Sequence, residues 1–199
     1  MTGENLTLVE ASPDYADDFR AMAREYAAQG PTHETPGYEE ALKDIPAAIG
    51  KLQDMARGVN LAEGLVPQTT YWLVRDSRTI VAVARLRHRL TPSLEIEGGH
   101  IGYSVRPSER RKGYGTLVCA LALRKAREMG LARALLTCDA DNAASARIIE
   151  KNGGDFDSIA CVEKTGKRVR RYWIDTAPEP HSPGRTTKTL NSGPVAGGT

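Results

Sequence analysis

The chain has 199 residues, enough for one ordinary domain with a single core but too few for two comfortable ones. Its hydrophobic share of 40% and charged share of 26% match those of a soluble globular protein. The formal net charge of +2 excludes a generally nucleic-acid-binding surface, so we expect no nucleic-acid partner.

The first part of the chain is predicted to form one strand and two helices. Residues 6–9 favour a short strand, and the Ser-Pro pair at 12–13 suits the cap and first turn of a helix. Apolar residues repeat on one face of that helix, and again at helical spacing over residues 38–55. We expect both helices to be amphipathic and to cover a sheet.

Strands follow in the middle of the chain. Residues 69–75 and 79–90 are predicted strands joined by a short polar turn, and they lead to a further strand at 100–105. In the second of these strands, apolar side chains fall on one face, and the other face carries Arg85, Arg87 and Arg89.

The second half is predicted as helix, strand, helix and hairpin. A helix at 114–129 ends near a glycine that suits its C-terminal cap. A buried strand covers 132–138, and a short helix covers 142–152. A hairpin with strands near 156–162 and 169–174 completes the predicted order.

Sequence outside this core indicates a tail and no membrane segment. Residues 177–199 are rich in Pro, Gly, Ser and Thr and cannot bury enough apolar surface to order themselves, so we expect one domain at 1–176 and a disordered tail. No apolar run is close to the length of about 20 residues that a membrane-spanning helix needs. The N-terminus lacks the pattern of a signal peptide, and we expect no membrane partner.

The cysteines favour a reducing compartment. Cys119, Cys138 and Cys161 are odd in number and widely separated, so we expect reduced thiols and a cytoplasmic protein. No pair of Cys or His residues has the spacing of metal ligands, so we expect no metal.

The most informative segment is a basic turn with glycines between the strand ending at Val105 and the helix starting at Tyr114. A helix N-terminus offers unpaired N–H groups and the positive end of its dipole, and glycine lets a phosphate approach the backbone closely. The cationic residues around this turn are Arg106, Arg110, Arg111 and Lys112. The segment therefore predicts a site for one small phosphorylated ligand.

Two common phosphate motifs do not fit this turn. A P-loop needs Gly-Lys followed by Ser or Thr, whereas this chain has Gly113-Tyr114-Gly115-Thr116. A dinucleotide fingerprint needs a third glycine where Val118 stands. Nucleoside triphosphates and dinucleotides are thereby excluded as the ligand of this turn.

The turn instead resembles the acetyl-coenzyme A motif of the GNAT superfamily of N-acetyltransferases, in which Arg or Gln is followed by Gly-x-Gly or Gly-x-Ala after two residues. Arg110, Gly113 and Gly115 fill those positions, and the pair Asn142 and Ser145 resembles the start of the second cofactor motif of the family. Within the superfamily, the region is similar to a branch of bacterial predicted acetyltransferases. The resemblance implies an α/β (α+β) GNAT fold, with a mixed, mostly antiparallel central sheet that is splayed at the cofactor site and flanked by helices.

The resemblance also implies where acetyl-coenzyme A, the acetyl donor, is bound. The backbone of the strand ending at Val105 and the start of the later helix hold the pantetheine, and the turn wraps the pyrophosphate. The residues expected to bind the cofactor are Tyr103, Ser104, Val105, Arg110, Arg111, Lys112, Gly113, Tyr114, Gly115, Thr116, Asn142 and Ser145.

Two candidates are expected to act in catalysis. By resemblance, a backbone N–H near Tyr103 stabilises the oxyanion that develops when a neutral amine attacks the thioester. The tyrosine that many relatives use as general acid is replaced here by Ile149, and a glutamate base of some relatives by Thr137. His100 is the candidate base, because an imidazole is suited to taking a proton at neutral pH; a structural role for His100 is the alternative.

The leading functional hypothesis is acetyl transfer from acetyl-coenzyme A to a primary amine of a small molecule. The alternatives are a catalytically silent acyl-coenzyme A sensor and a protein N-acetyltransferase. The two N-terminal helices and residues 87–97 are expected to select the acceptor. The final hairpin offers an edge strand for pairing in a possible homodimer.

Overall fold

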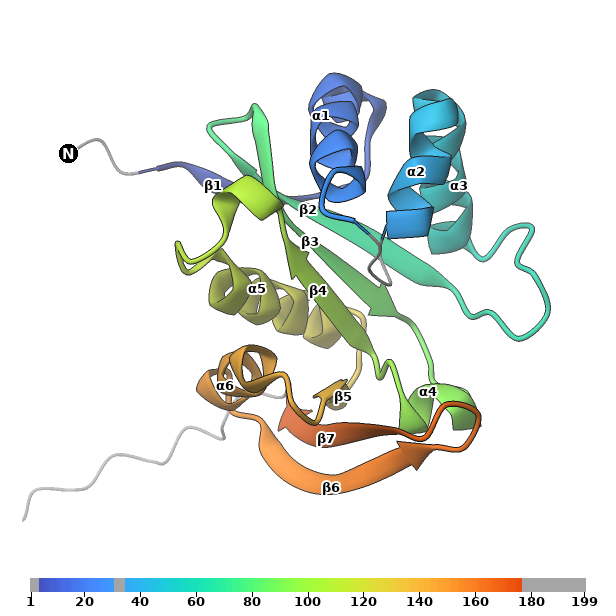
Figure 1. Cartoon of the computed structure of the whole chain (residues 1–199), viewed down its shortest axis with the longest axis vertical. Coiled ribbons are helices and arrows are strands. Elements are labelled where there is room, and N and C mark those ends of the chain that lie inside the picture. Colours follow the sequence, from blue (N-terminus) through green and yellow to red (C-terminus); the bar gives the residue numbers. More distant parts are fainter. Residues whose placement is uncertain (1–3, 31–34, 177–199) are drawn as a thin grey trace, which may run out of the picture.

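The computed structural model of the chain describes residues 4–30 and 35–176 (Figure 1). The tail predicted at 177–199 lies outside the described residues. These residues form a four-stranded and a three-stranded antiparallel sheet with helices packed against them. The α/β class with antiparallel sheets and flanking helices is thus confirmed.

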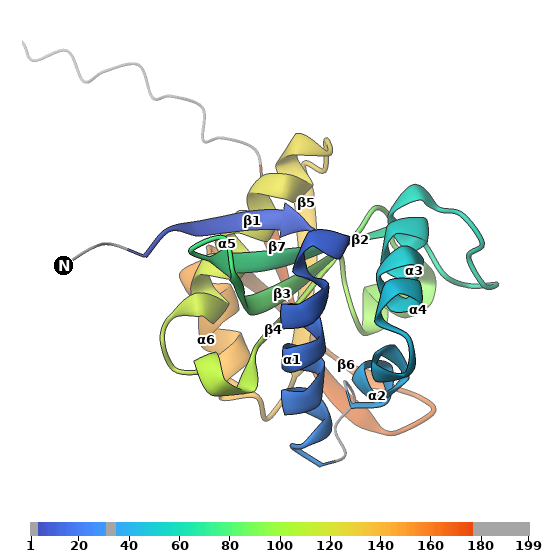
Figure 2. The ribbon, with the colours of Figure 1, turned by 90° about the horizontal axis from the view of Figure 1, so that it is seen from above.

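The four-stranded sheet has the order β1-β2-β3-β4, and each neighbouring pair is antiparallel. Its strands are β1 (Leu6–Glu10), β2 (Gln68–Arg75), β3 (Thr79–Arg87) and β4 (Ile101–Val105). Helices α1 (Ala16–Ala27), α2 (Thr35–Lys43) and α3 (Ile45–Arg57) cover one face, and α5 (Tyr114–Glu128) covers the other (Figures 1 and 2). Successive strand residues point to opposite faces, so Trp72 packs with α1 and Leu73 packs with α5.

The helix predicted at 38–55 is in fact two helices, α2 and α3. Asp44 is extended between them, and its side chain accepts a hydrogen bond from the Ala47 N–H at 3.0 Å. Pro46 lacks the N–H that a continuous helix would donate to the Leu42 carbonyl, so it suits the first turn of a new helix. The apolar spacing continues across the break because both helices pack on the same sheet face.

The strand predicted to reach Leu90 ends at Arg87, and a short helix that was not predicted, α4 (Pro92–Ile96), follows. Thr91 caps α4 by accepting a hydrogen bond from the Leu94 N–H at 3.3 Å. Proline at the first helical position suits this start. This helix places the loop that leads into β4.

The three-stranded sheet has the order β5-β7-β6 and carries the predicted hairpin. Its strands are β5 (Arg133–Asp139), β6 (Asp155–Val162) and β7 (Lys167–Asp175), and α6 (Ala143–Lys151) follows β5. β6 is an edge strand that exposes Phe156 and Ile159. Pairing of two copies along it stays a prediction.

The two sheets meet at β4 and β5, which form no backbone ladder with each other. They are joined at one end only, where the His100 N–H donates to the Leu135 carbonyl at 2.7 Å and the Leu135 N–H donates to Nδ1 of His100 at 2.9 Å. Gly99 permits this approach, since a Cβ there would lie 2.3 Å from the Leu135 oxygen. Beyond this junction β4 and β5 leave the opening that the sequence predicts.

No helix among the described residues is long and apolar enough to cross a membrane. Nor do residues 4–30 and 35–176 contain a group of three or more His, Cys, Asp or Glu side chains that could hold a metal ion.

Candidate active site

The turn before α5 presents unpaired backbone donors to a cavity. The N–H groups of Arg111 through Gly115 donate to no residue that the structure describes. Arg111 and Gly113 adopt positive φ values of 64° and 88°, which curls the chain around these donors. All residues from Arg111 through Gly115 except Lys112 border a cavity of about 530 Å³ that the turn shares with β4 and α6. Such a nest of N–H groups at a helix N-terminus binds phosphate.

Gly115 serves packing rather than backbone conformation. A Cβ at this position would lie 2.9 Å from Cδ1 of Ile148 and 3.5 Å from Cγ2 of Val105. The first turn of α5 therefore lies close to α6 and to the end of β4. This closeness gathers all three elements around one cavity.

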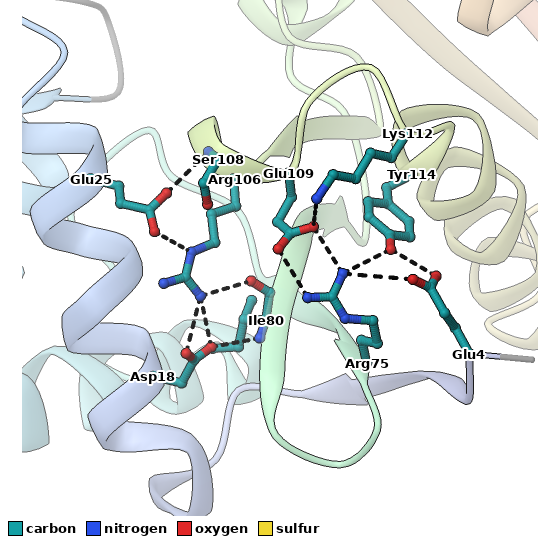
Figure 3. Close-up of polar contacts among 10 residues, drawn as sticks. All are labelled: Glu4, Asp18, Glu25, Arg75, Ile80, Arg106, Ser108, Glu109, Lys112 and Tyr114. Atoms are coloured by element: carbon teal, nitrogen blue, oxygen red, sulfur yellow. Dashed lines mark hydrogen bonds and ion pairs between the residues drawn. The ribbon is translucent and has the colours of Figure 1, made fainter. Parts of the chain in front are cut away.

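The cationic side chains of the turn face different ways. Arg106 is 7% exposed and does not line the cavity; it binds carboxylates of α1 instead (Figure 3). Lys112 pairs with Glu109 at 2.8 Å, and Arg110 donates to Gln29 at 2.9 Å. Arg111 lines the cavity without a hydrogen bond or ion pair to a described residue. The backbone thus supplies more of the anion site than the sequence pattern suggests.

A second polar network fixes the turn on β2. The buried carboxylate of Glu109 accepts hydrogen bonds from both terminal nitrogens of Arg75, at 2.9 and 3.0 Å (Figure 3). The Tyr114 hydroxyl accepts from Arg75 at 3.0 Å and donates to Glu4 at 2.8 Å. The hydrogen bonds from Arg75 lower the pKa of Glu109 against the effect of burial. The carboxylate stays ionised at neutral pH and holds the turn in place.

Strand β4 offers an open backbone edge beside this cavity. The Arg87 N–H donates to the His100 carbonyl, and the Arg106 N–H donates to the Val81 carbonyl. Because antiparallel partners alternate, the intervening pair Val83 and Ser104 is also bonded across the strands, so Ser104 faces β3 with its backbone. Ser104 nevertheless borders the cavity, and its part in binding the cofactor stays a prediction.

The neighbouring Tyr103 has the opposite orientation. Its backbone N–H and C=O face away from β3 and have no partner among the described residues. An extended ligand can hydrogen-bond to such an edge as an added strand does. Val105 also lines the cavity, and its carbonyl accepts from Nε of Arg110 at 3.3 Å.

The start of α6 lies across the opening from β4. Asn142 caps α6, since its Oδ1 accepts from the Ser145 N–H at 3.0 Å. The Oγ of Ser145 lies 2.9 Å from the Tyr103 hydroxyl. Burial raises the pKa of Tyr103, so this hydroxyl keeps its proton at neutral pH. Tyr103, Asn142 and Ser145 all border both the turn cavity and a second one.

The second cavity, of about 540 Å³, extends from Tyr103 toward α4. We call it the acceptor cavity. Thr137 and Cys138 of β5 line it, as do Arg85 and Arg87 of β3. Lys167, which also lines it, donates to Glu97 at 2.8 Å and pairs with Asp139 at 2.8 Å. The charge of Lys167 is thereby balanced within the protein.

A third cavity, of about 420 Å³, lies between helices α1 to α3 and strands β2 and β3. Phe19, Tyr38 and Trp72 give it an aromatic wall, and the buried Thr70 hydroxyl has no hydrogen-bond partner among the described residues. Arg85 borders both this cavity and the acceptor cavity. Sequence reasoning did not find this cavity, because its walls come from elements far apart in the chain.

The candidate base His100 lies at the junction of the sheets and lines none of these cavities. Only 7% of it is exposed, and its Nδ1 already accepts the Leu135 N–H. Burial and the charge of Arg87 lower the pKa of His100. The geometry favours the structural alternative, and a catalytic role stays a prediction.

The positions where relatives carry proton-transfer residues have different surroundings here. Ile149 is fully buried in the core between the sheets and α5, so it faces no cavity. The Thr137 hydroxyl lines the acceptor cavity and accepts from the Gly98 N–H at 2.9 Å.

The family model described as acetyltransferase (GNAT) domain matches residues 5–155 of the chain. Similar solved structures include Mycobacterium smegmatis RimJ in complex with CoA-disulfide, with a TM-score of 0.62, 15% identity and coverage of 85% of this chain and 81% of that chain. RimL, a ribosomal L7/L12 alpha-N-protein acetyltransferase, has a TM-score of 0.59, 17% identity and coverage of 88% and 92%. A protein assigned as a phosphinothricin N-acetyltransferase has a TM-score of 0.55, 15% identity and coverage of 87% and 100%. A search of curated proteins finds no match.

Proposed function

Because this chain belongs to the GNAT acetyltransferase family, we propose that it transfers the acetyl group of acetyl-coenzyme A to a primary amine of a small molecule. The observation that carries the proposal is the run of unpaired N–H groups from Arg111 through Gly115, next to the open backbone edge at Tyr103. The first suits the pyrophosphate and the second suits the pantetheine amides. Together they fit coenzyme A better than a simple anion.

The donor, when bound, supplies an activated acetyl group. The Tyr103 N–H faces the space between the two cavities, where it can donate to an oxygen that gains negative charge. The Tyr103 hydroxyl, held by Ser145, keeps a proton at the same junction. We propose that it takes the place of the general acid that Ile149 does not provide.

A small acceptor is favoured by the shape of the site. Lys167 links Glu97, in front of β4, with Asp139, at the end of β5, and all three line the acceptor cavity. Such a bridge limits the space for a polypeptide. The structural neighbours include one protein named for a small-molecule activity and one named for a ribosomal-protein activity.

The proposal also covers the cellular compartment of the protein and its pairing as a homodimer. All three cysteines are free thiols, as expected of a protein that works in the reducing cytoplasm. Two copies can pair along the exposed edge of β6, where no described strand lies beyond it.

The test combines a binding and a turnover measurement. Titration calorimetry should detect acetyl-coenzyme A binding, and a thiol-release assay with a panel of primary amines should detect coenzyme A formation. Binding without turnover on any amine would favour the sensor alternative, and turnover only on peptide N-termini would favour protein acetylation.

A matched pair of glycine variants tests where the donor binds. Gly113 and Gly130 lie just beyond opposite ends of α5, share a φ of 88°, and have no atom within 4 Å of a built Cβ. Glutamate at either position carries the same backbone cost, about 1–2 kcal/mol. Gly113→Glu should abolish donor binding, because its carboxylate stands at the phosphate site, whereas Gly130→Glu should bind normally. Equal affinity of the two variants would contradict the placement of the pyrophosphate.

A further inference from the structure

Arg87 is held in a fixed position at the end of β3. Its Nη1 donates to the carbonyl oxygens of Gly98 at 2.9 Å and Gly99 at 3.0 Å, both in the loop between α4 and β4. The guanidinium packs against Gly98, where a built Cβ would lie 3.6 Å from its central carbon. Nη1 therefore anchors the guanidinium on this loop through two hydrogen bonds.

The remaining nitrogens of Arg87 have no partner among the residues that the structure describes. Nε and Nη2 donate to no residue in 4–30 or 35–176, and no carboxylate of these residues lies within ion-pair distance. Both nitrogen atoms are accessible to solvent. Arg87 also lines the acceptor cavity. The two free nitrogens therefore open onto this cavity.

The charge of Arg87 is unfavourable in the free protein. Burial and the neighbouring Arg85 lower the pKa of Arg87, yet a guanidinium does not lose its proton in proteins. Charges in such positions are normally paired with an opposite charge. Lys167, which lines the same cavity, is different, because its charge is already balanced by Glu97 and Asp139.

The chemistry of the missing partner follows from the free atoms. Nε and Nη2 form one side of the guanidinium, which matches the two oxygens of a carboxylate. Anchoring of Nη1 on two carbonyls fixes the orientation of this side before a ligand arrives. The phosphates of the donor are assigned to the other cavity, so the carboxylate belongs to another molecule.

We propose that the acceptor is an amino-acid-like molecule, whose carboxylate is bound by Arg87 while its amine is presented at Tyr103. This inference rests on the proposed acetyltransferase function. Such a molecule carries both a carboxylate and an amine. Arg87 is then a specificity-determining residue that touches substrate.

The experiment compares acceptors that differ only in the carboxylate. Phenylalanine with phenethylamine and lysine with cadaverine are two suitable pairs, assayed with wild type, Arg87→Gln and Arg87→Lys. The solvent-exposed Arg89, two residues further along, supplies the control variant Arg89→Gln. In wild type, kcat/KM should be higher for the acid of at least one pair.

In Arg87→Gln, loss of a charge-assisted hydrogen bond should raise KM for that acid about 10- to 150-fold. KM for the matched amine and for acetyl-coenzyme A should change less than about threefold, within the spread of a surface substitution. Arg87→Lys keeps the charge and tests the proposal even where the glutamine variant fails to fold; it should lose part of the preference. Equal loss on acid and amine, or no preference in wild type, would overturn the inference.

A binding measurement distinguishes failure of the proposed acetyltransferase function from failure of the proposed carboxylate site. If no amine is acetylated, calorimetry of the same acids and amines on coenzyme A-loaded protein still measures the site. Binding of an acid that weakens in Arg87→Gln would support the carboxylate site in a protein that is not this enzyme. Absence of such binding would overturn the site as well.

Discussion

Replacing Arg106 by methionine should destabilise the fold by removing the cation between α1 and the turn. The Arg106 side chain is 9% exposed, and its Nε donates to Glu25 at 2.7 Å. Its Nη1 donates to both carboxylate oxygens of Asp18, at 3.0 and 3.1 Å (Figure 3). Methionine fills similar space without charge, so the change isolates the ionic contribution.

The loss of unfolding free energy depends on the two carboxylates, Asp18 and Glu25, that remain without their cation. Removing one partner of a buried ion pair costs about 3–5 kcal/mol, because the remaining charge stays uncompensated. Asp18 and Glu25 side chains are 24% and 29% exposed, and each keeps one backbone donor, the Ile80 or the Ser108 N–H. We therefore expect the lower limit, about 3 kcal/mol, which lowers Tm by about 6–12 °C.

The pH dependence of stability tests the same ion pair between Arg106 and Glu25. Burial alone would raise the pKa of Glu25, but hydrogen bonds from Ser108 and Arg106 lower it below its ordinary value. A depressed carboxyl pKa contributes stability that is present above the unfolded value, about 4.3, and lost as pH falls through the folded value. The Arg106→Met variant should lose part of this acid dependence.

Urea unfolding of wild type and variants at pH 7 measures the effect. Arg110→Met is the control, because Arg110 is exposed and its donors reach only an amide and a carbonyl oxygen; it should cost less than about 1 kcal/mol. Adding Asp18→Asn and Glu25→Gln to Arg106→Met should restore part of the loss, since no buried anion remains. A cost of Arg106→Met below about 1 kcal/mol would refute the reasoning.

Two further predictions concern the sheet junction and the break between α2 and α3. The lowered pKa of His100, caused first by burial, means that the unfolded chain binds more protons below about pH 6.5; stability should fall as pH drops through that range, and less so in His100→Gln. The pH–rate profile of that variant should keep its shape, and loss of an ionisation near neutral pH would instead identify His100 as the base. Asp44→Ala should cost about 1 kcal/mol in thermal unfolding through loss of the α3 cap, and an unchanged Tm would contradict that role.

The sequence predicts most of the helices and strands well, because these depend on short-range patterns. The start and cap of α5 and α6 follow from residues within a few positions of each other, as with Asn142 and Ser145. The break at Asp44 was missed although its cap and Pro46 are visible in the sequence, since the apolar period continued across it. Local signals deserved more weight there than periodicity.

Long-range partners could not be predicted from the sequence. Arg106 belongs by its position to the basic turn, yet its carboxylates lie 81 and 88 positions away in the chain. Arg87 lies on the arginine face of a predicted strand, and this pattern alone does not indicate a cavity beside it. Only the structure brings Arg87 together with the loop after α4 and with β5 around one cavity.

The opening between β4 and β5 has a consequence for the protein without its ligand. Each of these strands is an unpaired sheet edge there, and exposed edges are templates for pairing between molecules. A ligand that fills the opening would act as a clamp between the two sheets. At a concentration of 100 times its Kd it would add about 2.7 kcal/mol of stability by mass action. Purification and storage with coenzyme A should therefore suppress aggregation as well as preserve the site.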